Sequence, residues 1–121
     1  MNISVEILQL LSEVGYMSCF KNDTKNAKII MDGVDAIAGD QVPTKMGVAL
    51  VDLYSGRYDK AIDTLQNYVL VREPDHMSAQ CFLGMALKMS GKDSEAKDIF
   101  DHVVKNGNDD ERVIASVHLG I

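Results

Sequence analysis

The side chains best suited to catalysis or metal binding in this 121-residue sequence are three histidines and two cysteines. A zinc site needs clustered His, Cys or carboxylate ligands, and a nucleophile needs a base within hydrogen-bonding reach. None of the histidines pairs with another potential ligand at such a spacing, and the two cysteines lie far apart within helical patterns. We therefore expect surface or helix-end histidines, reduced thiols, and no metal, cofactor or catalytic group. These five residues are His76, His102, His118, Cys19 and Cys81.

Two further stretches match ligand-binding loops only in part. Residues 84–92 suggest a phosphate-binding loop, but Ala86 stands where that loop needs a glycine and Asp93 replaces its Ser or Thr. The acidic run 109–111 lacks the further oxygen ligands of a calcium loop, so it indicates negative charge at the start of a helix. We therefore expect that the protein is not an enzyme.

The charge and the apolar pattern disfavour several kinds of partner. The net charge of −6, with scattered basic residues, argues against a nucleic-acid surface and against binding to anionic lipid. No apolar run approaches the roughly 18 residues of a membrane span, and the first residues lack the basic start of a signal peptide. We expect a cytoplasmic protein without membrane insertion.

The elements that position these residues recur along the sequence. Residues 53–65 read LYSGRYDKAIDTL. A shift of 35 residues along the sequence places Gly56 on Gly91 and Ala61 on Ala96. Subtracting 34 takes Ala61 to Ala27. A period of this length indicates repeated pairs of helices, each with a residue between its helices that tolerates a left-handed backbone. The predicted units cover residues 8–41, 42–76 and 77–111, with turns at Asn22, Gly56 and Gly91.

Helix starts and ends are predicted at the unit boundaries. Pro43 suits a first helical turn, Asp75 is a predicted N-cap, and Gly107 follows a helix end. Asp109 or Asp110 should cap a last helix over residues 110–119, which we expect to close the array. Its polar side (Glu111, Arg112, Ser116, His118) is expected in solvent, and its apolar side (Val113, Ile114, Val117) is expected to face inward.

The repeat resembles the tetratricopeptide repeat (TPR), a pair of helices of about 34 residues. The third unit matches the TPR pattern at Leu83-Gly84, Gly91, Ala96 and Phe100. The resemblance implies an all-α single domain over residues 1–121, with three helix-turn-helix repeats in a right-handed superhelix and a short C-terminal capping helix. The middle unit matches the TPR pattern at Gly56, Tyr58, Ala61, Leu65 and Pro74, although Pro74 comes one position late. This unit departs from the pattern at Lys45 and Asp52. The first unit matches at Val14-Gly15 and Ala27.

The first helix of each unit is apolar on a second face, which in the TPR family lines a concave groove. Methionine and aromatic side chains on this face favour an adaptable surface that accepts an amphipathic helix from another protein. The alternative is that the same residues form the core. A clamp for acidic peptide C termini is not expected, because Lys88 is the one cation nearby. The predicted groove consists of Tyr16, Phe20, Met46, Leu50, Leu53, Tyr54, Cys81, Phe82, Met85 and Met89.

The layout of three repeats in a short acidic chain resembles the needle-subunit chaperones of bacterial type III secretion systems. This resemblance implies a protein that holds a needle subunit monomeric in the bacterial cytoplasm by binding its amphipathic helix, in a heteromeric complex with a small helical co-chaperone. The alternatives are a chaperone of type III translocator proteins and a general TPR scaffold. We expect the co-chaperone, or a second copy when the partner is absent, to contact the N-terminal helix at Ile3, Ile7, Leu8 and Leu11.

Overall fold

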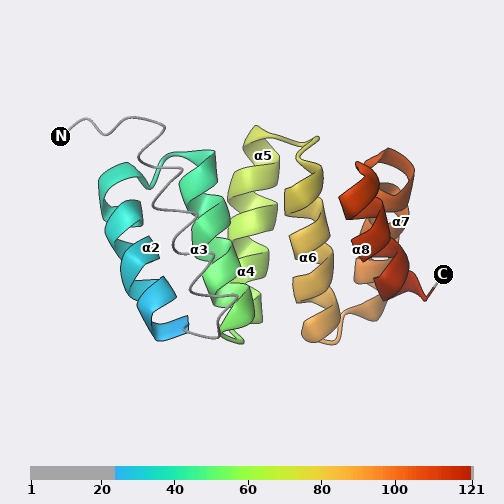
Figure 1. Ribbon diagram of the computed structural model, residues 1–121, viewed down its shortest axis with the longest axis horizontal. Helices are drawn as coiled ribbons and strands as arrows, with labels where there is room; N and C mark the ends of the chain where they lie inside the picture. The colour runs from blue at the N-terminus through green and yellow to red at the C-terminus, as the bar shows by residue number, and fades with distance from the viewer. Residues whose placement is uncertain (1–23, 121) are drawn as a thin grey trace.

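The computed structural model describes residues 24–120, and helices account for nearly all of them (Figure 1). No strand occurs in this described part, which confirms the predicted all-α class. Several residues of the predictions lie outside it: Ile3, Ile7, Leu8, Leu11, Tyr16, Phe20 and Asn22. The helices are α2 (Thr24–Ala38), α3 (Val42–Tyr54), α4 (Tyr58–Thr64), the π-helix η1 (Leu65–Val69), α5 (Leu70–Arg72), α6 (Met77–Met89), α7 (Asp93–Asn106) and α8 (Asp109–Leu119).

Neighbouring helices pack side by side along one long axis, with α2 at one end and α7 and α8 at the other (Figure 1). Helices that follow each other along the chain are in contact: α2 with α3, α3 with α4, α6 with α7, and α7 with α8. In addition, α4 contacts α6, α3 contacts α6, and α6 contacts α8. As a result, α3 and α6 are packed on more than one side.

Two helix pairs in the array share the same spacing. The helices α3 and α6 begin at residues 42 and 77, and α4 and α7 begin at residues 58 and 93, so each pair is offset by 35 residues. Between the helices, Gly56 and Gly91 have φ values of +82° and +86°, which confirms the predicted left-handed turns. The amides that follow, of Arg57 and Lys92, donate to carbonyls five residues earlier at 2.8 and 2.9 Å. These hydrogen bonds form a Schellman motif, which ends each helix at its glycine.

The second helix of the middle pair is one residue longer than α7. It runs without a break through α4, η1 and α5. The extra residue is accommodated in η1, where the hydrogen bonds span five residues instead of four. This wider turn keeps Ala61, Leu65 and Val69 buried on one side of the helix. It also accounts for Pro74, which comes one position later than in the TPR pattern.

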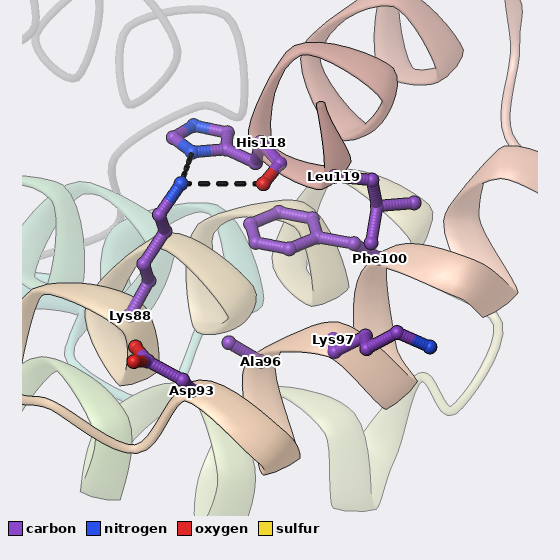
Figure 2. A pocket seen from close by; sticks show the side chains of 7 residues that line it. All are labelled: Lys88, Asp93, Ala96, Lys97, Phe100, His118 and Leu119. Atoms are coloured by element: carbon purple, nitrogen blue, oxygen red, sulfur yellow. Dashed lines mark hydrogen bonds between the residues drawn. The ribbon is translucent and has the colours of Figure 1, made fainter. Parts of the chain in front are cut away.

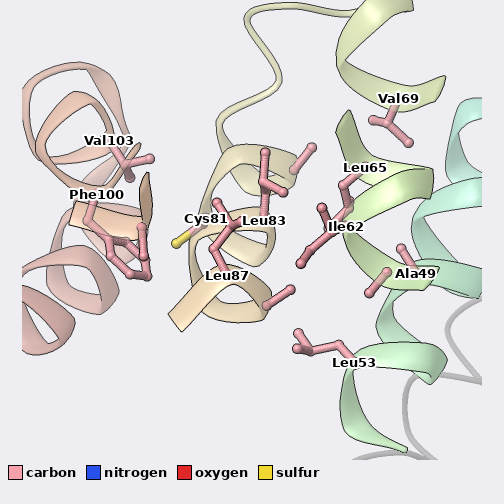
Figure 3. Packing of buried hydrophobic residues seen from close by; sticks show 14 of the residues in the cluster. Ala49, Leu53, Ile62, Leu65, Val69, Cys81, Leu83, Leu87, Phe100 and Val103 are labelled. Carbon is pink, nitrogen blue, oxygen red and sulfur yellow. The ribbon is translucent and has the colours of Figure 1, made fainter. Parts of the chain in front are cut away.

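The core consists mainly of small and branched apolar residues between the helices, together with Met46, Cys81 and Phe100 (Figure 3). Phe100 of α7 is buried against α6 at Gly84, where an added Cβ would lie 2.8 Å from two ring atoms. Only a glycine at this position lets the two helices approach so closely. The alanines Ala27, Ala61 and Ala96 are also buried, as the predicted close contact between paired helices requires.

Two predicted N-caps are wrong by one or two residues. The cap of α6 is His76 rather than Asp75, and its Nδ1 accepts a hydrogen bond from the amide three residues later at 3.1 Å. The cap of α8 is Asn108 rather than either aspartate that follows it (Asp109, Asp110), and it forms a reciprocal capping box with Glu111, with both bonds at 2.9 Å. An asparagine caps a helix as well as an aspartate does. Two other boundary predictions are confirmed: Pro43 lies in the first turn of α3, which begins at Val42, and α7 ends before Gly107.

The last helix, α8, is oriented opposite to the prediction. The three residues expected to face inward, Val113, Ile114 and Val117, are exposed, and Val117 retains 71% of its accessible surface. Two polar residues face inward instead. The carboxylate of Glu111 accepts a hydrogen bond from Ser78 Oγ of α6 at 2.8 Å, and His118 stacks on Phe100 of α7. Because these polar groups have partners, the apolar residues are left outside.

Candidate protein-binding surface

Four residues of the predicted groove are buried, namely Met46, Leu50, Leu53 and Cys81. Leu50, for example, retains 5% of its accessible surface. Met46, Leu53 and Cys81 belong to the main core cluster, because α3 contacts α6 as well as its neighbours along the chain. The expected exposure of these four side chains is therefore corrected, and they are core residues, as in the alternative interpretation.

The remaining described residues of the groove are exposed or half-buried. Met89 retains 60% of its accessible surface, Tyr54 is also exposed, and Phe82 and Met85 are half-buried. Phe82, Met85 and Met89 recur at intervals of three and four on one side of α6. Tyr54 and Met89 are the last residues of α3 and α6, which run in the same direction and contact each other (Figure 1). We call Tyr54, Phe82, Met85 and Met89 the apolar strip.

The two charged residues that depart from the TPR pattern on α3 form ion pairs. Lys45 Nζ lies 2.9 Å from Asp35 Oδ1 of α2. Asp52 Oδ1 accepts a hydrogen bond from Arg57 Nε in the following turn at 2.7 Å. A half-buried charge is tolerated when it is paired in this way. The sequence showed the two departures but not their partners, which come from other elements of the fold.

A pocket of about 250 Å³ lies between the end of α6, the start of α7 and the end of α8 (Figure 2). The ring of His118 stacks on Phe100, with centroids 4.8 Å apart and planes inclined by 5°. Lys88 Nζ donates to the His118 carbonyl oxygen at 3.2 Å and lies 3.4 Å from its Nδ1. Burial, and then the Lys88 ammonium, lower the pKa of His118, so its ring is neutral at neutral pH. The lining residues are Lys88, Asp93, Ala96, Lys97, Phe100, His118 and Leu119.

The side chains that line this pocket include two lysines, an aspartate and a histidine, but no hydroxyl or thiol nucleophile. Its lining contains no Ser, Thr or Cys, and no group of three or more potential metal ligands occurs among residues 24–120. Burial, and then Glu111, raise the pKa of the nearby core thiol Cys81 to about 11. At neutral pH this thiol is therefore protonated and a weak nucleophile. The sequence placed His118 at a helix end but gave no sign of its stacking contact, which joins two helices.

Within the described part of the chain, no helix combines the length and the apolarity needed to cross a lipid bilayer. The chain matches no protein-family model, no curated protein and no solved structure. A proposal for function therefore depends on the surfaces described above and on the resemblance of the repeat pattern.

Proposed function

We propose that this protein is a TPR-like chaperone that binds an amphipathic helix of another protein along the apolar strip. The observation that carries the proposal is the uncharged row of Phe82, Met85 and Met89 on α6, with Tyr54 at the end of the adjacent α3. Methionine side chains adapt to irregular apolar partners, and a helix bound in a groove presents residues at matching intervals of three and four. The equal offset of the helix pairs and their glycine turns support a TPR-like repeat array with a right-handed superhelix.

Within this class, we propose a needle-subunit chaperone of a bacterial type III secretion system. The acidic composition, the repeat layout and the methionines of the apolar strip support this assignment. In this role the protein keeps a needle subunit monomeric in the cytoplasm, and a small helical co-chaperone binds at Ile3, Ile7, Leu8 and Leu11. A chaperone of translocator proteins, or a general TPR scaffold, would use the same strip and differ in its client.

Two substitutions separate binding at the apolar strip from folding. Met89→Glu places a charge where a bound helix would bury it. The Kd for a fluorescein-labelled peptide with the C-terminal helix of a needle subunit should therefore rise at least about tenfold, or about 1.4 kcal/mol. Val71→Glu on α5 is the matched control, because Val71 is similarly exposed, at 67%, and lies outside the strip. Both variants should melt within a few degrees of the wild type, and equal peptide affinities for the two variants would contradict the proposal.

A further inference from the structure

Among the described residues 24–120, both end helices of the array expose an apolar face. On α8, the outward residues are Val113, Ile114 and Val117, and on α2 they include Ile29 and Ile37. The two helices lie at opposite ends of the array (Figure 1). Exposed apolar side chains that cluster on one face of an end helix favour contact with another protein surface.

The face of α2 has a shallow depression between its two isoleucines, where the side chains are small. Gly33 and Ala36 lie between Ile29 and Ile37 and are exposed, and a Cβ added at Gly33 would meet nothing within 4 Å. The face of α8 has the complementary form, because its branched side chains are adjacent. The open space above Gly33 would admit a branched side chain such as a valine of α8. Two α2 faces packed together would instead place glycine opposite glycine and leave this space unfilled.

The charges at the starts of the two helices are opposite in sign. The first residues of α8 are Asp109 and Asp110, Lys25 lies in the first turn of α2, and all three are exposed. A parallel contact between α8 and α2 brings these opposite charges together, whereas an antiparallel contact brings the aspartates close to Asp40. Two α8 faces would bring the aspartates together or place them at the negative end of the other helix dipole.

From this complementarity of shape and charge, we propose that α8 of one copy packs in parallel on α2 of a second copy. Val113 and Val117 then lie against Ile29, Gly33 and Ile37. Because the two faces are at opposite ends of the array, each contact leaves one α2 face and one α8 face free. Further copies can therefore add at either end, and the assembly is an open chain unless its rotation closes it into a ring. The helices α2 and α8 run in opposite directions in Figure 1, so each added copy is turned over relative to its neighbour. This contact is independent of client binding at the apolar strip.

Blocking one end at a time tests the contact by sedimentation velocity. The wild type should sediment faster as its concentration rises from low micromolar to several hundred micromolar. Val117→Asp blocks the α8 face and Ile29→Asp blocks the α2 face, so each variant alone should remain a monomer. An equimolar mixture of the two should form a heterodimer and stop there, because one free α2 face meets one free α8 face. Val71→Asp, which leaves both end faces intact, should associate as the wild type does.

A charge exchange tests the parallel orientation. Lys25→Glu should weaken the association several-fold, and adding Asp110→Lys to the same chain should restore it. The proposal is overturned if the wild type stays monomeric throughout, or if the mixture of blocked variants stays monomeric. It is also overturned if either blocked variant associates alone, which would indicate a contact between two α2 faces, between two α8 faces or elsewhere. A failure to restore association would overturn the parallel orientation.

Discussion

Replacing Gly84 with alanine tests the close packing of α6 against α7. The new Cβ would lie 2.8 Å from Cε1 and Cζ of Phe100 and 3.2 Å from Cδ1. Ordinary contacts between carbon atoms are about 3.5–4.0 Å. Phe100 retains 1% of its accessible surface, and His118 stacks on one face of its ring, so the ring has little room to move. Overpacking of this kind costs about 1–3 kcal/mol of folding free energy.

Gly33→Ala is the matched control for this substitution. Both glycines lie inside helices, so both variants gain about 1 kcal/mol of helix propensity. At Gly33 the new Cβ meets nothing within 4 Å. Gly33→Ala should therefore raise the free energy of unfolding by up to about 1 kcal/mol, and Gly84→Ala should lie about 1–3 kcal/mol below it. Urea unfolding at low protein concentration, followed by circular dichroism, measures both values. A Gly84→Ala variant as stable as Gly33→Ala would refute the close approach of the two helices.

Three further predictions concern buried groups. Burial and a nearby lysine lower the pKa of His118 below 6.5. Below that pH the unfolded chain therefore binds more protons than the folded chain, and the free energy of unfolding should decrease as the pH falls. Urea titrations at about pH 7 and about pH 5 should show a decrease that is smaller in His118→Gln. Leu50→Glu should lower the free energy of unfolding by about 3 kcal/mol or more, because it buries a charge in the core. A melting temperature for Leu50→Glu that is no lower than that of Tyr54→Glu would contradict the core position of Leu50. With Cys19 replaced by serine, Cys81 should react with DTNB much more slowly in the folded than in the unfolded chain, and equal rates would indicate an open groove.

The turns and the helix spacing were predictable because they depend on local properties of the sequence. Gly56 and Gly91 occupy positions where φ is positive, and glycine adopts this conformation at the lowest cost. The offset of 35 residues follows from the repeated glycine and alanine positions. The late position of Pro74 is the one sequence sign of the longer helix that contains η1.

The exposed sides of the helices were not predictable in the same way, because they depend on contacts between distant residues. Leu50 is buried and Val117 is exposed, although both belong to apolar stripes with helical spacing. Glu111 faces inward because it accepts a hydrogen bond from Ser78, 33 residues earlier, and His118 does so because it stacks on Phe100. No local pattern indicates such partners, so hydrophobic periodicity alone assigns α8 the wrong orientation.

Methionine methyl NMR tests the proposed client site most directly. In a chain labelled with carbon-13 at the methionine methyl groups, Met85 and Met89 report on the apolar strip, while Met31 and Met46 report on the core. Addition of a peptide with the C-terminal helix of a type III needle subunit should shift or broaden the signals of Met85 and Met89. The signals of Met31 and Met46 should remain in place. Binding of the peptide without any change at Met85 and Met89, or no binding at saturating concentrations, would contradict the assignment of the apolar strip as the client site.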